Sequence, residues 1–416
     1  MKRQLLLITC LLAGPSVAAS DPADLPPTAQ VEPALHAHPT VRAAEAGLRA
    51  EEANRDRLEA GPHEFALKLS GQQRRDRPLD VTYHEHEVGI ERAIRLPGKA
   101  TTDAEMGKTG VEQARFLVGD ALHESSRLLL KGWFDWQREM VAVQEWRKQV
   151  AILERQQEVV AKRVGAGDAA RLEALLAQAQ LLQAQAQLAQ VQTRHDHAAL
   201  EVSQNFPAIV LPQTIVAATP QLPADSADQW RERILEHNHE LRVAMLATRR
   251  SRLTAQRLDA DRFADPTVGL RMASERGGQE HIVGLQLTIP LGGSARAASA
   301  RAGAAEADAA SAREALVKAR VEAEARRTVA AASSAYPQWL RLAEVARRME
   351  DNANLLDKAW RLGEGHFGEL QTARRQAIEA RLAESQARLD ANEARYRLLL
   401  DAHALWSPGN DTNHEH

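Results

Sequence analysis

The strongest constraint on the fold is a strand pattern that passes directly into a very long helical pattern, twice in the chain. From His281 to Gly293 the sequence HIVGLQLTIPLGG alternates apolar with polar or small residues, as a two-faced strand does. An Ala-, Glu- and Arg-rich stretch follows at once and has no proline before Pro337. The segment from His86 to Gly98, HEVGIERAIRLPG, has the same design, and six of its residues recur 195 positions later. The chain is therefore an internal duplication.

The first 19 residues have the layout of a secretory signal peptide. Lys2 and Arg3 precede an apolar run from Leu5 to Leu12, and residues 17–19 (VAA) form a small-residue cleavage site. The alternative is a short buried helix. Cys10, the only cysteine, lies inside the apolar run, so we expect no lipid anchor and no disulfide in the mature chain.

The composition narrows the class of protein. The net charge of −3 gives no indication of nucleic-acid binding. Aromatic residues make up only 4% of the chain, which suits packed long helices better than a bulky globular core. Beyond the signal peptide, no apolar run reaches the 18 or more residues typical of a transmembrane helix, so a membrane role would have to come from strands.

Each repeat is predicted to contain a helix, a strand pair and a long helical hairpin. The first helices are expected at Leu35–Ala60 and, 200 residues later, Leu235–Ala260. We divide the chain into a signal peptide (1–19), an extended Pro-containing lead-in (20–34), a first repeat (35–205), a Pro-rich connector (206–225), a second repeat (226–406) and a polar tail (407–416).

The strand pairs have the length that a tilted strand needs to cross a bilayer, about 9 to 11 residues. The first pair is expected around Phe65–Ser70 and Glu87–Ile94, separated by a charged loop from Gly71 to Asp80. The second pair brackets a loop from Ser274 to Glu280. An ordinary soluble sheet with one wet face would alternate in the same way.

The helical hairpins are too long for a globular domain. The proline-free run from Gly98 to Val164 would extend roughly 100 Å, so it must lie in a bundle or coiled coil. The returning helices are expected at Ala169–Asn205 and Phe367–Leu405. In the last helix a heptad seam is formed by Leu382, Leu389 and Tyr396 together with Ile378, Ser385, Asn392 and Leu399.

The turns of these hairpins contain paired glycines. Gly165 and Gly167 correspond to Gly363 and Gly365 at an offset of 198. Their G-x-G spacing resembles a dinucleotide-binding motif, but that motif follows a strand and these glycines follow a helix. We interpret them as residues that adopt left-handed dihedrals at helix ends, with Asp168 capping the next helix.

Histidine-x-histidine pairs are the candidate metal ligands. Only His84/His86 and His414/His416 fall where an extended backbone would place both rings on one side. Solvated surface histidines are the alternative for each pair.

The remaining motifs indicate packing rather than catalysis. Trp133 and Trp136 align with Tyr336 and Trp339 at an offset of 203 and are expected in the core. The sequence contains no recognisable catalytic triad, C-x-x-C, H-E-x-x-H or phosphate loop. We therefore expect neither an enzyme nor a cofactor.

Four membrane strands cannot stand alone, because each unpaired backbone group in lipid costs several kcal/mol. Two copies would make a filled eight-stranded barrel, and three would make a twelve-stranded barrel with a bore. The residues expected to face inward are small or polar and favour three copies: Ala66, Ser70, Gly89, Gly269, Gly284 and Gln286. The expected fold class is a transmembrane β-barrel continued by a periplasmic α-helical barrel.

The duplicated plan, the IPLGG segment and the paired tips resemble the TolC-like outer-membrane efflux proteins over nearly the whole mature chain. The tip pattern of that family, Gly with an acid six residues later, fits Gly363 and Glu369, whereas Arg171 stands where the first tip would have an acid. In the family, acids near the second tip narrow a closed periplasmic mouth. Glu369 matches one such position, and Thr372 occupies another.

This resemblance implies a passive homotrimeric duct in outer-membrane lipid. The duct would receive its substrate from an inner-membrane pump, of the RND type, through a periplasmic adaptor docked on the tips formed by Gly165, Gly167, Asp168, Arg171, Gly363, Gly365, His366, Glu369 and Thr372. The histidine pairs and the absent lipid cysteine look more like the cobalt-zinc-cadmium (CzcC-like) branch of the family than like its lipidated drug-efflux branch. Drug efflux, type I secretion and a secreted coiled-coil structural protein are the alternatives.

Overall fold

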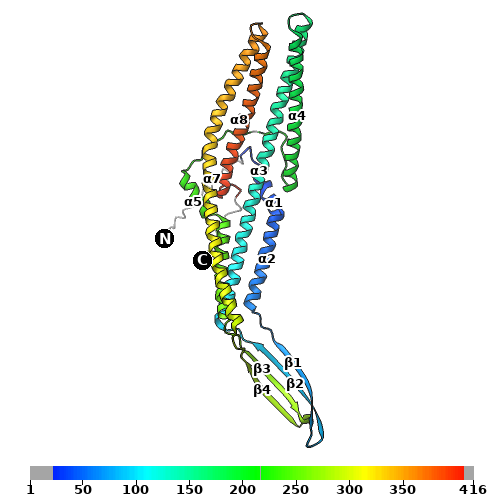
Figure 1. The fold of residues 1–416 in the computed structure, drawn as a ribbon, viewed down its shortest axis with the longest axis vertical. Coiled ribbons are helices and arrows are strands. Elements are labelled where there is room, and N and C mark those ends of the chain that lie inside the picture. Colours follow the sequence, from blue (N-terminus) through cyan, green and yellow to red (C-terminus); the bar gives the residue numbers. More distant parts are fainter. Residues whose placement is uncertain (1–21, 216, 407–416) are drawn as a thin grey trace, which may run out of the picture.

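The computed structural model describes residues 22–215 and 217–406. The signal peptide predicted at 1–19, together with His414 and His416, lies outside the described residues. The molecule is strongly elongated, with a β-sheet at one end, two helical hairpin tips at the other, and two short helices, α1 and α5, between them (Figure 1).

The sheet contains four antiparallel strands in the order β1-β2-β3-β4. They are β1 (Ala66–Asp76), β2 (Val81–Ala93), β3 (Thr267–Glu275) and β4 (Glu280–Thr288). The loop predicted from Gly71 to Asp80 is wrong over most of its length, because Gly71 to Asp76 pairs with β2. Polar side chains indicated exposure to water there, but the backbone still forms a ladder.

The two faces of the sheet differ in chemistry. On one face Leu67 lies opposite Ile90, and the same row continues through Leu270 to Leu285, which is 86% exposed. The other face holds cross-strand ion pairs such as Lys68–Glu91 at 2.7 Å, and it holds every small or polar residue predicted to face inward. One exposed face is therefore apolar and the other is polar.

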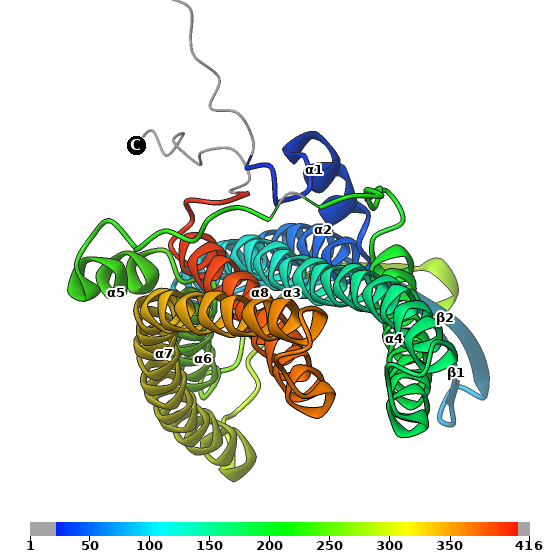
Figure 2. The ribbon, with the colours of Figure 1, turned by 90° about the horizontal axis from the view of Figure 1, so that it is seen from above.

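Each strand pair continues into one long helix. These are α3 (Pro97–Gly165, 69 residues) and α7 (Ser294–Arg361, 68 residues), each about 100 Å long. Shorter helices pack along them: α2 (Pro39–Ala60) and α4 (Arg171–Asn205) on α3, and α6 (His239–Ala260) and α8 (Phe367–Asp401) on α7. Viewed from above, the helices form a curved layer with α1 on its convex side (Figure 2). None of the helices described here has an apolar run that could cross a bilayer.

Two predicted boundaries are wrong at the start of the repeats. The lead-in contains a helix, α1 (Thr28–Ala37), whose Val31, Ala34 and Leu35 are buried. Its Pro33 is tolerated because these apolar contacts outweigh one lost backbone hydrogen bond. The helix expected from Leu35 breaks before Pro39. The helix expected at Leu235–Ala260 also breaks, between α5 (Ala227–Glu236) and α6, where the Asn238 side chain caps the second helix.

The aromatic pairs predicted in the middle of the two long helices differ in burial. Trp133 and Trp136 are buried as predicted, and Trp133 donates a hydrogen bond to the carbonyl of Asp24 at 2.8 Å. Tyr336 and Trp339 are only half-buried. The last residues of α3 and α7 are 196 positions apart, not 203. At that offset Trp133 and Trp136 correspond to Val329 and Ala332, which are buried.

Candidate functional site: the helix tips and the interface between the hairpins

The first tip ends α3 with a left-handed residue. Gly167 has φ +83°, its N–H donates to the carbonyl of Val164 at 3.1 Å, and the N–H of Asp168 donates to Arg163 at 2.8 Å. This pair of bonds is a Schellman motif, which satisfies carbonyls at the helix end and favours glycine. Gly165 is the last residue of α3.

The second tip repeats this geometry. Gly363 has φ +79° and its N–H donates to Trp360 at 3.1 Å, while the N–H of Glu364 donates to Ala359 at 3.0 Å. Gly363 is therefore the counterpart of Gly167 at an offset of 196. The offset of 198 expected for the tips, which paired it with Gly165, is wrong by two residues. Gly365 lies further on, in the turn before α8.

The corrected register gives both tips an acid at the same place. Glu173 follows Gly167 by six residues, as Glu369 follows Gly363, and each lies in the first turn of its helix. Arg171 is the first residue of α4 and does not replace the acid.

Two other expectations at the tips have different outcomes. Asp168 does not cap α4, because the N-cap position is taken by Ala170, two residues later; the corresponding residue before α8 is His366. Glu369 and Thr372 are both exposed on α8, and the Thr372 hydroxyl donates to the carbonyl of Gly368 at 3.0 Å. The tip residues thus form a solvent-facing surface.

Behind the tips, an apolar cluster joins the two hairpins. Val160 and Ala177 from the first hairpin pack with Trp360, Phe367 and Leu370 from the second. The guanidinium carbon of Arg163 lies 5.0 Å from the centroid of the Trp360 ring, a cation–π distance.

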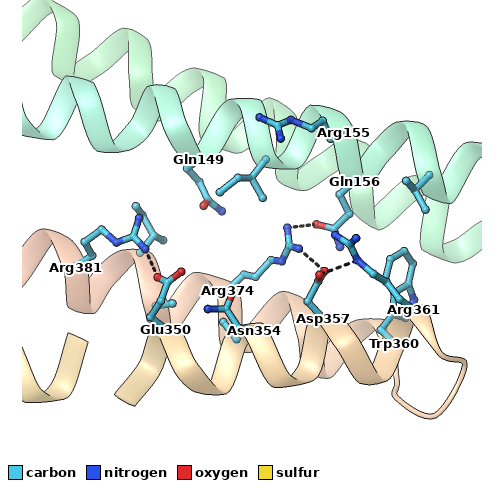
Figure 3. Close-up of a pocket in the computed structure, with 15 residues that line it drawn as sticks. Gln149, Arg155, Gln156, Glu350, Asn354, Asp357, Trp360, Arg361, Arg374 and Arg381 are labelled. Atoms are coloured by element: carbon cyan, nitrogen blue, oxygen red, sulfur yellow. Dashed lines mark hydrogen bonds and ion pairs between the residues drawn. The ribbon is translucent and has the colours of Figure 1, made fainter. Parts of the chain in front are cut away.

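A polar connection follows about one turn further along. Arg374 on α8 reaches between Gln156 on α3 and Asp357 on α7 (Figure 3). Its guanidinium donates to the Gln156 side chain at 3.0 Å and forms an ion pair with Asp357. Asp357 also accepts from Arg361 at 2.8 Å.

A second arginine repeats this arrangement two turns away. Arg381 on α8 pairs with Glu350 on α7 and with Glu145 on α3, the latter at 3.3 Å. Burial opposes the charge on Arg381, but the two carboxylates outweigh burial and raise the pKa of the guanidinium. Arg374 and Arg381 therefore tie α3 to the second hairpin by charge-assisted hydrogen bonds.

The space between these ties is a cavity of about 350 Å³, lined by residues of α3, α7 and α8. Ile152 and Val159 give it an apolar side on α3, opposite Arg374 and Arg381. The hairpins are thus joined at separate points with a cavity between them.

Sequence reasoning missed these arginines, although a signal for them was present. The members of the pairs Asp357–Arg374 and Glu350–Arg381 are equally distant from the Gly365–His366 peptide, as cross-partners in a helical hairpin must be. The heptad seam predicted in α8 consists of apolar, small and uncharged polar residues, and the arginines lie beside it.

The histidine candidates on the sheet share one face. His84 and His86 lie on β2, both exposed, whereas Glu85 between them is buried on the opposite face. Within residues 22–215 and 217–406, no group of three or more histidine, cysteine or acidic side chains is arranged to hold a metal ion.

Known proteins resemble this chain in structure only. No family profile and no curated protein sequence matches it. A membrane protein from Pseudomonas aeruginosa superposes with a TM-score of 0.77 at 16% identity, covering 99% of both chains. The outer-membrane channel OprN gives 0.72 at 18% identity over 91% of this chain and 90% of its own, and the Campylobacter jejuni CmeC outer membrane channel gives 0.75 at 13% over 92% and 87%. The chain therefore has the fold of outer-membrane channel proteins.

Proposed function

We propose that this chain is the outer-membrane channel of a tripartite efflux system and exports heavy-metal cations. The observation that carries the proposal is the sheet, which is apolar on one exposed face and polar and ion-paired on the other. A sheet in water has no reason to expose Leu67, Leu69 and Leu285 on one side. A wall between lipid and an aqueous bore needs that division.

Closure of the wall requires further copies of the chain. In the described part of the chain, β1 and β4 each pair along one edge only. In lipid those free edges would be very costly, so we infer a homotrimer with a twelve-stranded barrel. The curved layer of helices in Figure 2 suits one third of a helical tube on the periplasmic side.

The tips are the proposed docking surface for a periplasmic adaptor, which would connect the duct to an inner-membrane pump of the RND type. They are exposed, lie farthest from the sheet and present the same turn twice in each chain (Figure 1). Three chains would offer six nearly equivalent turns to the adaptor.

The metal cargo is proposed from the histidine content, 15 residues. His84 and His86 do not support it, because they lie with Val88 on the apolar face of the sheet and not on the polar face that would line the bore. Deletion should sensitise cells to zinc, cobalt, cadmium or copper, and the wild-type sequence should restore tolerance. Unchanged metal tolerance with increased antibiotic sensitivity would instead indicate drug efflux. A product that fractionates in plain buffer and forms no pore in planar bilayers would indicate a structural coiled-coil protein.

The mouth can be tested at Glu369. Replacing it with Ala should raise single-channel conductance, because a carboxylate in the first turn of α8 would narrow the passage. Glu364→Ala is the matched control, since this acid lies in the turn before the helix. Equal conductance of Glu369→Ala and wild type would exclude Glu369 from the constriction.

A further inference from the structure

Four histidines gather midway along the molecule, far from both the tips and the sheet. His123 belongs to α3, His237 follows α5, His239 begins α6 and His403 follows α8. The ring of His403 lies at the centre, with centroids 5.4 Å from His123, 5.7 Å from His237 and 4.9 Å from His239. This histidine cluster joins the first repeat to the second.

The backbone of His403 is unusual for its residue type. Its φ is +55°, its N–H donates to Leu400 at 3.0 Å and the N–H of Ala404 donates to Leu399 at 2.7 Å. This is the same Schellman geometry as at the tips, where glycine holds the left-handed position. A side chain there costs roughly 1–2 kcal/mol, so the contacts of the imidazole must maintain it.

Gly119 on α3 leaves space for the His239 ring of the cluster. It lies inside α3, and a Cβ at this position would be 2.7 Å from Cε1 of His239. Glycine within a helix costs about 0.5–1 kcal/mol relative to Ala. The helix thus makes room for the imidazole at the expense of its own stability.

The cluster has little negative charge left to balance a proton. Nε2 of His123 lies 3.5 Å from the buried carboxylate of Asp401, but Arg127 and Arg397 also bind that carboxylate, each at 2.9 Å. The other charged or titratable groups around the cluster are Glu32 and His36 on α1, Asp120 and Glu124 on α3, Glu240 on α6 and Arg320 on α7.

Burial, together with a smaller effect of the neighbouring His239, His123 and His237, lowers the pKa of His403 to about 4, and Asp401 opposes this shift only weakly. A free imidazole has a pKa near 6.5. An opened cluster therefore takes up a proton below about pH 6.5 that the packed cluster does not accept until about pH 4. The packed arrangement is fully stable above pH 6.5 and loses stability as the pH falls between these values.

We propose that the histidine cluster is a proton-sensitive clasp, which holds the segment His403–Trp406 against α3 and the α5–α6 junction at neutral pH and releases it in mild acid. Leu405 and Trp406 pack against the aromatic core, and Trp406 helps to line a cavity of about 80 Å³ beside three of the histidines. Release would uncover that core.

The ring geometry favours protons over a metal ion as the ligand. The planes of His123 and His403 are parallel within 1°, in a stacked pair, so their nitrogens do not converge on one point. A shared metal would require both ring planes to contain it.

Hydrogen exchange of the full-length protein in detergent tests the clasp. Exchange is compared at about pH 7.5 and about pH 5, after correction for intrinsic rates. We expect backbone amides of residues 399–406 and 239–243 to lose protection at the lower pH, on the order of 30-fold from His403 alone. Peptides from the tip ends of α3 and α7 serve as the internal control and should not change.

His403→Asn provides the matched variant, because Asn tolerates a positive φ and does not titrate. It should keep protection at neutral pH and lose the acid response. His237→Gln removes an exposed member of the cluster and should weaken the response without endangering the fold.

Three outcomes would overturn the clasp. Protection of residues 399–406 could be equal at both pH values, or His403→Asn could retain the full acid response. Zinc ions at about pH 7.5 could also protect these amides in the wild type but not in His403→Asn, which would make the cluster a metal site instead.

Discussion

At the scale of single residues, Arg374 is the group whose loss should loosen the tips most. It is 14% exposed and bonded to both Gln156 and Asp357. Arg374→Ala should cost about 2 kcal/mol in local opening, because it leaves two partners partly buried without it. The measurements are hydrogen exchange of residues 353–361 and channel conductance, both of which should increase.

Arg361→Ala is the matched control for Arg374. It removes the other partner of Asp357, but this arginine is 68% exposed, and exposed pairs contribute roughly 0–1 kcal/mol. If the two variants opened the tips equally, the tie across α3, α7 and α8 would have no special role.

Asp401 should set the acid limit of the stability of the molecule. Its burial raises the pKa, but His123, Arg127 and Arg397 outweigh burial and lower the pKa to about 2. A depressed carboxyl pKa stabilises the fold above the ordinary value of 3.8, and this contribution is lost as the pH falls through 2. Asp401→Asn should lower the unfolding free energy by about 2 kcal/mol near pH 7. In denaturation experiments, the difference in unfolding free energy between wild type and Asp401→Asn should shrink below pH 4. A difference that stays constant with pH would contradict an electrostatic role for the Asp401 carboxylate.

At the scale of elements, the two faces of β4 should respond oppositely to the same substitution. Leu285→Arg places a cation on the apolar face, which in a bilayer costs about 2–4 kcal/mol near the midplane. Gln286→Arg, one residue further on, places it on the polar face. We expect the first variant to be lost from the outer-membrane fraction and the second to be retained. Equal retention would contradict a lipid-facing role for the Leu285 side.

Repeated patterns over many residues were predictable from the sequence. The uninterrupted helix of α3 and the heptad positions of α8 follow from periodicity, and Leu389, Tyr396, Ile378 and Asn392 are indeed buried. Boundaries decided by single contacts were not predictable. Polar residues 71–76 remain in a strand because their backbone is paired, and residues 28–37 form a helix because α1 has a core to cover.

The register of the tips shows a further limit. Matching glycines in sequence favoured an offset of 198, whereas φ and hydrogen bonds select 196. Two glycines per tip satisfy the same letter pattern, and only the backbone reveals which of them is left-handed. The wrong offset placed Arg171 at the position where the tip pattern has an acid. The correct offset places Glu173 there.

At the scale of the whole molecule, the proposed trimer requires β1 of one copy to pair with β4 of the next. The only cysteine in the sequence is Cys10, so engineered cysteines would have no competitor once the predicted signal peptide is removed. A panel of double variants, with one cysteine at Lys68 or Ser70 on β1 and one at Gly284 or Gln286 on β4, covers the neighbouring registers on the polar face.

At least one member of this panel should form a covalent ladder that ends at three chains on denaturing gels. A cysteine on β2 at Glu87 with one on β4 is the control, because β2 is already paired on both sides and cannot reach a neighbour. A ladder that ends at two chains would indicate an eight-stranded barrel. Side chains fill the interior of a barrel of that size. The polar face would then need a packed interior, and its Lys68–Glu91 and Arg271–Glu87 pairs would have to be buried without water. The desolvation penalty of such buried ion pairs exceeds their electrostatic attraction, so we expect three chains around a water-filled bore.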